Sequence, residues 1–273
     1  MPLHPLVNIG VRAARRAGDI IFRSLNRLES LEVSSKGRND YVTEVDRHAE
    51  ADIIATIQRT HPDHSFLGEE SGLTKGASDE FVWIIDPLDG TTNFMHGLPQ
   101  FCVSIAVQHR GRIEHAIVYD PMRQELFTAS HGGGAQLDDK RIRVSKSRGL
   151  EGALISTGFP YRDNNTEWLD AYLAMFKAVT LATAGIRRPG SAALDLAWLA
   201  AGRTDAFWEM GLGPWDAAAG SLLVTEAGGR ISTLAGDDYA LGSDLIAGSP
   251  KTYEELLALL APHLPADLRS SRP

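Results

Sequence analysis

Two aspartates stand at the end of a predicted buried strand, in the segment WIIDPLDGTTNF at residues 83–94. The apolar run before them predicts a strand in the core, and carboxylates are costly to bury unless something compensates their charge. Pro87 fixes its own backbone and keeps Asp86 out of the helical region, so this turn is rigid. The fold must therefore place a compensating group beside Asp86 and Asp89.

Divalent cations are the group that this turn suits. Mg²⁺ binds several carboxylate and carbonyl oxygens, and residues 86–89 offer two carboxylates and a main-chain carbonyl. Residues 90–92 then offer backbone N–H groups at a predicted helix start, which suits a phosphate. A pair of Mg²⁺ ions about 4 Å apart is a standard clamp for phosphoryl displacement. Such a site needs more carboxylates than one turn supplies.

Further acidic residues lie at the ends of other predicted elements, namely Asp46, Glu69, Glu70 and Asp216. Each has a structural alternative. Asp46 and Asp216 stand where a helix N-cap would stand, Glu69 and Glu70 suit a solvated loop, and Asp89-Gly90 suits a turn. A joint metal site requires Glu69 and Asp216 to converge on residues 86–89, which sequence spacing does not decide.

The element pattern predicts two α/β lobes, residues 1–148 and 149–273. Helical periodicity occurs over residues 5–28, 46–60, 166–181, 191–202, 216–229 and 250–263. Strand patterns occur over 101–108, 112–120, 124–130, 153–157, 204–210 and 244–248. The first half is rich in strands, and the second alternates strands with helices.

Charge and cysteine usage narrow the functional classes. The net charge of −8 argues against a broad nucleic-acid footprint, because phosphate binding needs a basic face. Cys102 is the single cysteine, so no internal disulfide is expected and a reducing, cytoplasmic setting fits best. The N-terminus has no long apolar region typical of a signal peptide, and no stretch approaches the roughly 20 apolar residues of a membrane span. Cys102 lies mid-strand, which favours a small core residue over a reactive thiol.

Three segments, GEESG, WIIDPLDGTTNF and GPWDAAAGSLLVTEAGG, resemble the signature segments of the inositol monophosphatase family, and the similarity runs from residue 42 to residue 229. The segment GSAALDLAWLAAG, followed by FWEMGLGPWD, looks most like the bacterial SuhB-type members. The resemblance implies an α+β fold of α/β layers, the five-layered αβαβα sandwich. It also implies a lithium-sensitive phosphatase that needs two or three Mg²⁺ ions, for which Mn²⁺ can substitute.

The activity that the resemblance implies is hydrolysis of myo-inositol monophosphate, and of related polyol and sugar monophosphates, by direct attack of an activated water. The family motifs place metal ligands at Glu69, Asp86, the Leu88 carbonyl, Asp89 and Asp216. Asp46 and Thr91 match the pair that activates the water, with Glu69 and a loop lysine, Lys36, beside it. Gly90 and Thr91 match the phosphate cradle. The substrate alcohol would face Asp89, Gly190, Ser191, Ala192, Glu209 and Asp216. The first lobe would thus carry most metal ligands and the phosphate cradle, and the second would carry Asp216 and the alcohol pocket.

Two alternatives remain open. One is a phosphatase for a nucleotide 3′,5′-bisphosphate or fructose-1,6-bisphosphate, although Glu209 favours a polyol. The other is a non-catalytic role as a partner of the transcription-elongation and antitermination machinery, including NusA and RNA polymerase. In that case Arg187 and Arg188, in a predicted exposed loop over residues 185–189, would contact the partner. The alternative is that this loop only connects to the helix that begins near residue 191 and binds no partner. The family also implies a homodimer.

Overall fold

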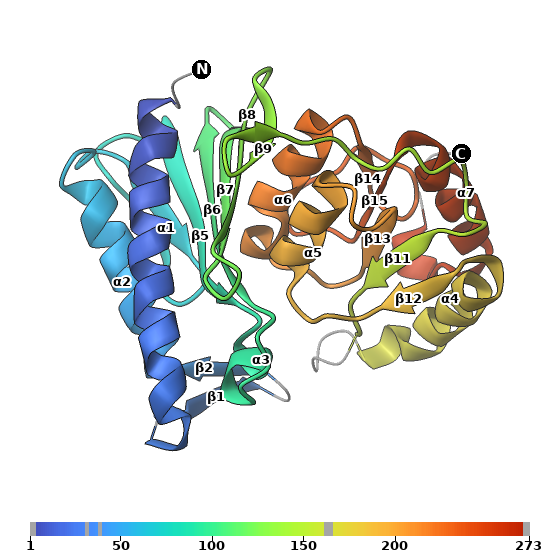
Figure 1. The fold of residues 1–273 in the computed structure, drawn as a ribbon, viewed down its shortest axis with the longest axis horizontal. Helices are drawn as coiled ribbons and strands as arrows, with labels where there is room; N and C mark the ends of the chain where they lie inside the picture. The colour runs from blue at the N-terminus through green and yellow to red at the C-terminus, as the bar shows by residue number, and fades with distance from the viewer. Residues whose placement is uncertain (1–3, 31–32, 38–39, 161–165, 270–273) are drawn as a thin grey trace.

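An eight-stranded sheet and a five-stranded sheet organise the molecule (Figure 1). The computed structural model describes residues 4–30, 33–37, 40–160 and 166–269. The larger sheet has the order β10-β9-β8-β7-β6-β5-β3-β4 and the smaller one β12-β11-β13-β15-β14. The larger sheet contains β3 (Ser65–Gly68), β4 (Gly72–Thr74), β5 (Phe81–Asp89), β6 (Cys102–His109), β7 (Arg112–Asp120), β8 (Glu125–Ser130), β9 (Gly134–Leu137) and β10 (Lys140–Arg141). The smaller sheet contains β11 (Leu154–Thr157), β12 (Gly185–Arg187), β13 (Ala206–Glu209), β14 (Arg230–Ser232) and β15 (Leu245–Gly248). A separate antiparallel pair joins β1 (Val33–Gly37) to β2 (Asp40–Thr43).

Helices fill three layers around the two sheets. The α-helices are α1 (Pro5–Ser24), α2 (Glu44–Gln58), α3 (Thr91–Met95), α4 (Leu169–Ala182), α5 (Ala192–Ala200), α6 (Pro214–Glu226) and α7 (Pro250–Leu260). Short 3₁₀ turns span Leu25–Ser30, Thr166–Trp168, Ala261–His263 and Ala266–Leu268. In Figure 1, α1 and α2 cover the outer face of the larger sheet, α5 and α6 lie between the sheets, and α4 and α7 cover the smaller sheet. This order confirms the predicted αβαβα layers of an α+β fold. None of the helices in the described ranges is both long enough and apolar enough to cross a membrane.

Alternation along β5 divides the core between two layers. Trp83 and Ile85 are fully buried against α1 and α2. Ile84, between them in sequence, is buried on the opposite face with α5 and α6. This is the period-two pattern of a strand covered on both faces. Cys102 is buried in the same middle layer as Ile84, which agrees with its predicted role as a core residue.

The segment predicted as an exposed loop over 185–189 differs from that expectation. Residues 185–187 form β12, an edge strand that pairs in parallel with β11. Arg187 is exposed, whereas Arg188 is only half-buried and its guanidinium lies 5.0 Å from the Phe159 ring centroid. The expectation of two exposed arginines is therefore wrong for Arg188.

The lobe boundary after residue 148 stays a prediction; it falls between β10 and β11.

Candidate functional site

The end of β5 contains an irregularity that turns two aspartates to one side. Asp86 pairs with Ser104 of β6, but Asp89 pairs with Cys102, so four residues of β5 face three of β6. In a regular strand, residues three apart point to opposite faces. The extra residue, at a position where Pro87 cannot donate to the ladder, removes that alternation. Asp86 and Asp89 can therefore share one site.

A third aspartate from the second half of the chain completes a compact acidic cluster. One carboxylate oxygen from each of Asp86, Asp89 and Asp216 lies within 4.8 Å of the others. The side chains are 1%, 8% and 6% exposed. Glu69 follows β3, and its side chain is within hydrogen-bonding reach of Asp86. Four of the predicted metal ligands thus lie together. The carbonyl of the fifth, Leu88, lies 3.1 Å from the Thr91 hydroxyl.

Burial and mutual repulsion dominate the electrostatics of this cluster. Burial raises the pKa of Asp86 well above its usual range, and the charges of Glu69, Asp89 and Asp216 raise it further. Burial likewise raises the pKa of Asp89 to about 6, although hydrogen bonds from Ser191 and Ala193 oppose that shift. Like charges at this spacing remain ionised together only when cations or donors neutralise them. The donor set is entirely oxygen, which suits a hard divalent cation.

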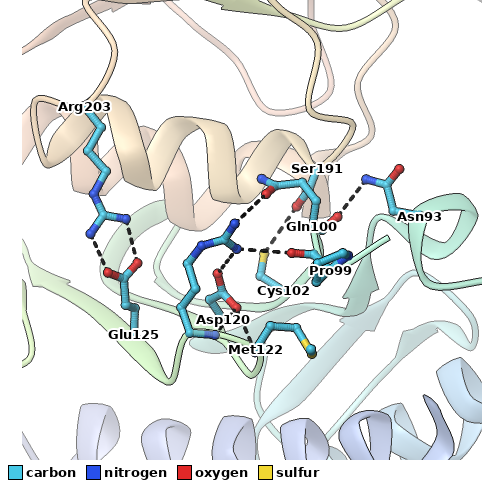
Figure 2. Close-up of polar contacts among 10 residues, drawn as sticks. Asn93, Pro99, Gln100, Cys102, Asp120, Met122, Glu125, Ser191 and Arg203 are labelled. Atoms are coloured by element: carbon cyan, nitrogen blue, oxygen red, sulfur yellow. Dashed lines mark hydrogen bonds and ion pairs between the residues drawn. The ribbon is translucent and has the colours of Figure 1, made fainter. Parts of the chain in front are cut away.

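Asp89 joins the larger sheet to the start of α5. Its Oδ2 accepts hydrogen bonds of 2.7 Å from the Ser191 hydroxyl and 2.7 Å from the Ala193 backbone N–H, residues 102 and 104 positions away in sequence. The Cys102 Sγ lies 3.8 Å from the same oxygen and 3.7 Å from the Ser191 hydroxyl, as Figure 2 shows for the latter pair. The positive end of the α5 dipole adds to this stabilisation. A carboxylate of the first half is therefore held by the second half.

Asp46 has two partners that connect a helix start to Thr91. One oxygen accepts from the backbone N–H and the hydroxyl of Thr43, at 2.9 and 2.5 Å, in a capping box at the start of α2. The other accepts from the Thr91 hydroxyl at 2.9 Å. Asp46 is fully buried, and burial raises its pKa, against the opposing effect of these hydrogen bonds. Asp46 and Thr91 therefore lie together, as the family motifs imply.

The N-cap alternative is wrong for Asp46 and Asp216. The N-caps are Thr43 and Gly213, and both aspartates occupy the third helical position. Asp216 Oδ2 accepts from the Gly213 N–H at 2.6 Å, and one oxygen of the same carboxylate belongs to the cluster. The same local pattern, an acid three residues after a cap, therefore serves helix formation and the site together.

The turn after Asp89 begins α3. Gly90 has φ of 102°, and a Cβ there would lie 2.9 Å from the Gln100 carbonyl oxygen, so only glycine fits. The helix start predicted at residues 90–92 is confirmed, since α3 begins at Thr91. Lys36 belongs to β1, but its side chain lies outside the described part of the structure.

A pocket beside the cluster contains the residues predicted to face the substrate alcohol. Its lining includes Asp89, Gly190, Ser191, Ala192, Glu209 and Asp216. Gly158 packs so closely under Glu209 that a Cβ there would overlap the carboxylate. The lining also includes residues that no sequence motif indicated, among them Asp195, Arg188 and Phe159. Asp195 had a usable signal, because it is the one charged residue of an otherwise apolar helix, α5.

Polar contacts also join segments that lie far apart in the sequence (Figure 2). The Asn93 amide donates to the carbonyl oxygens of Gln100 and Pro189, at 2.7 and 2.8 Å, so α3 holds the segment that leads into Gly190. Arg203, just after α5, makes a two-pronged ion pair with Glu125 of β8. These contacts fix α5 against the larger sheet.

Glu50 is a positioning residue that no sequence motif indicated. It lies on α2 and is 3% exposed. Its two oxygens accept from the backbone N–H groups of Glu70 and Ser71, at 3.0 and 2.9 Å. A Cβ at Gly68 would overlap the Glu50 carboxylate, which explains the glycine of the GEESG motif. Glu50 therefore fixes the backbone of the loop that places Glu69 beside Asp86.

Comparisons with known proteins agree over nearly the whole chain. The model of the family described as "Inositol monophosphatase family" matches residues 2–265. The protein named "Nus factor SuhB" of Pseudomonas aeruginosa is 53% identical over 270 residues, which are 98% of this chain and all of that protein. Among solved structures, extragenic suppressor protein SuhB of Bartonella henselae is 43% identical with a TM-score of 0.91, covering 94% of this chain and 98% of that one. An inositol monophosphatase from Anabaena is 36% identical with a TM-score of 0.84, covering 96% and 97%.

Replacing Glu50 should weaken cation binding without removing a ligand. Glu50→Gln loses one charge-assisted hydrogen bond to the 69–71 loop, and such supporting contacts typically change metal affinity roughly tenfold or more. Titration of Mn²⁺ by calorimetry measures this. Glu44→Gln, an exposed acid on the same helix, is the matched control. Equal Mn²⁺ affinity in the two variants would contradict the assignment.

Without divalent cations, Asp89→Asn should gain stability relative to the unmodified chain as the pH rises. The folded chain holds a proton on Asp89 up to about pH 6, whereas the unfolded chain releases it near 3.8. The stability from the raised pKa is fully present below the unfolded value and is lost as the pH rises through about 6. Urea unfolding in the presence of a chelator measures the free energy of unfolding of both chains. The difference between the two values should change by about 2–3 kcal/mol across that pH window. A difference that does not depend on pH would refute this prediction.

Proposed function

This chain belongs to the inositol monophosphatase family, and we propose that it hydrolyses polyol monophosphates, foremost myo-inositol monophosphate, with Mg²⁺ as its cofactor. The observation that carries the proposal is the convergence of Asp86, Asp89 and Asp216 beside a polar pocket. Three buried carboxylates in one site lower the stability of the chain unless they bind something cationic. A function that uses the cation explains why the fold retains them.

The proposed ligands are the carboxylates of Glu69, Asp86, Asp89 and Asp216 together with the Leu88 carbonyl. Their oxygens suit Mg²⁺, with Mn²⁺ as a substitute. When bound, such cations would neutralise the cluster, polarise the phosphate and favour loss of a proton from the attacking water. Burial of the cluster strengthens each of these effects, because the local dielectric is low.

The chain itself supplies a path for the proton of the attacking water. Thr91 lies 2.9 Å from Asp46 Oδ1 and can donate its hydroxyl hydrogen there. The Thr91 oxygen then accepts a hydrogen bond from a water, which orients that water for attack on phosphorus. As the O–P bond forms, the water proton passes to Thr91 Oγ1 and the threonine proton to Asp46 Oδ1. The raised pKa of Asp46 suits this role as a base.

The remaining pocket suits the alcohol that leaves. Ser191 and Ala192, at the start of α5, face the cluster, and Glu209 offers a carboxylate to hydroxyl groups. As the water oxygen bonds to phosphorus, the bond between phosphorus and the substrate oxygen breaks. That oxygen keeps the bonding electron pair, takes a proton from a solvent water and leaves as the alcohol. Asp195 and Glu209 line this pocket and are not among the proposed cation ligands, so two carboxyls beside the single basic group of Arg188 disfavour a second phosphate there. This favours a polyol monophosphate over a nucleotide 3′,5′-bisphosphate or fructose-1,6-bisphosphate.

Asp86→Asn should reduce phosphate release from myo-inositol 1-phosphate by about two orders of magnitude or more, because it removes a charge at the centre of the cluster. A phosphate-release assay with Mg²⁺ measures kcat/KM, and Asp63→Asn, an exposed aspartate, is the control. Wild-type activity should also be inhibited by lithium. A higher kcat/KM for a nucleotide bisphosphate than for inositol phosphate would overturn the choice of substrate.

A second candidate function is suggested by the relatives named Nus factor SuhB, such as that of Pseudomonas aeruginosa. We propose that this chain also acts in the cytoplasm with the transcription-elongation machinery, including NusA and RNA polymerase. Exposed Arg187 on the edge strand β12 is one place for such a contact. Homodimer formation stays a prediction, which sedimentation analysis would test.

The Asp86→Asn chain separates the two roles. In a Pseudomonas aeruginosa strain that lacks its SuhB relative, we expect this variant to restore an antitermination reporter as well as the wild-type chain does, because the surface is unchanged. Failure of the wild-type chain to restore the reporter would remove the second function. Failure of the folded variant alone would tie the cellular role to hydrolysis.

A further inference from the structure

Asp195 has one carboxylate oxygen, Oδ1, for which the described residues provide no hydrogen-bond partner. The residue lies in the first turn of α5 and is 1% exposed. Its Oδ1 is fully buried and has no hydrogen-bond partner among the residues that the structure describes. A buried carboxylate in that condition is costly, and the positive end of the helix dipole offsets only part of the cost. The fold therefore retains an acceptor that something outside the chain can satisfy.

The position of Asp195 indicates which molecule that is. Asp195 lines the same pocket as Glu209, Ser191 and Ala192. The acidic cluster formed by Asp86, Asp89 and Asp216 does not include it. Asp195 therefore belongs to the part of the pocket where the alcohol would lie.

The charges around Asp195 favour hydroxyl groups over anions. Burial raises the pKa of its carboxyl well above the usual range, Glu209 and Asp89 raise it further, and Arg188 opposes the shift. Two neighbouring carboxyls can share donor and acceptor roles, and a hydroxyl both donates and accepts. A second phosphate would instead face the carboxyls of Asp195 and Glu209, with Arg188 as a basic neighbour.

We propose that Asp195 is a specificity-determining residue that, together with Glu209, binds hydroxyl groups of the substrate alcohol and so selects polyhydroxylated alcohols over simple ones. The inference rests on the proposed phosphatase function and adds to it a recognition residue on α5. A site built to bind a hydroxyl rejects an analogue that lacks it, because the buried polar group is then left unpaired.

The test compares two substrates of one enzyme, myo-inositol 1-phosphate and p-nitrophenyl phosphate, whose alcohol has no further hydroxyl. Asp195→Ala should lower the ratio of their kcat/KM values about tenfold or more, mostly through the KM for inositol phosphate. Asp195→Asn, which keeps an acceptor oxygen, should recover part of that ratio. Asp170→Ala, an exposed acid in the first turn of α4, should leave the ratio as it is.

Thermal unfolding supplies a readout apart from activity. Removal of an unpaired buried carboxylate should leave Tm unchanged or raise it in both Asp195 variants. If the variants have a lower Tm and the same fractional loss of kcat/KM for both substrates, the role of Asp195 is purely structural and the inference is overturned. If the wild-type chain hydrolyses neither substrate, the proposed function fails, and this inference fails with it.

Discussion

The rest of the structure depends on the burial of like charges at the end of one strand. Asp86, Asp89 and Asp216 lie within 4.8 Å of one another, and their repulsion must be compensated in a place that water barely reaches. The compensation comes partly from backbone and hydroxyl donors of the second half of the chain, as at Ser191 and Ala193. The same requirement that makes the site able to bind a cation therefore holds the two halves of the molecule together.

Helix starts contribute to this compensation. The first turn of α5 donates to Asp89, and the first turn of α6 carries Asp216, whose carboxylate is fixed by Gly213. Because the N-terminal end of a helix is electropositive, two helices of the middle layer direct their favourable ends toward the acids. The middle layer thus has two tasks. Its apolar faces fill the space between the sheets, and its ends stabilise the site.

The fold and most of the candidate site were predictable from sequence, for different reasons. Periodicity located the longer helices and strands but not short strands such as β3, β4 and β14. Motif resemblance supplied the layer order that Figure 1 confirms. Convergence of Glu69 and Asp216 on Asp86 followed from the motifs rather than from spacing, since 127 residues separate Asp89 from Asp216. The strand bulge at Asp86–Asp89 and the support from Glu50 were not foreseen, because both depend on which strand or loop lies alongside. Arg188 was expected to be exposed because nothing in the sequence around it shows that the distant Phe159 ring lies against its guanidinium.

The double attachment of Asp46 has a consequence for the dynamics of the protein. The same carboxylate closes the first turn of α2 through Thr43 and anchors the Thr91 hydroxyl. Fraying of that turn and release of Thr91 are consequently one local opening event rather than two. The exchange rate of the Thr43 amide hydrogen, measured on the intact protein, therefore reports how often the turn that holds this carboxylate opens.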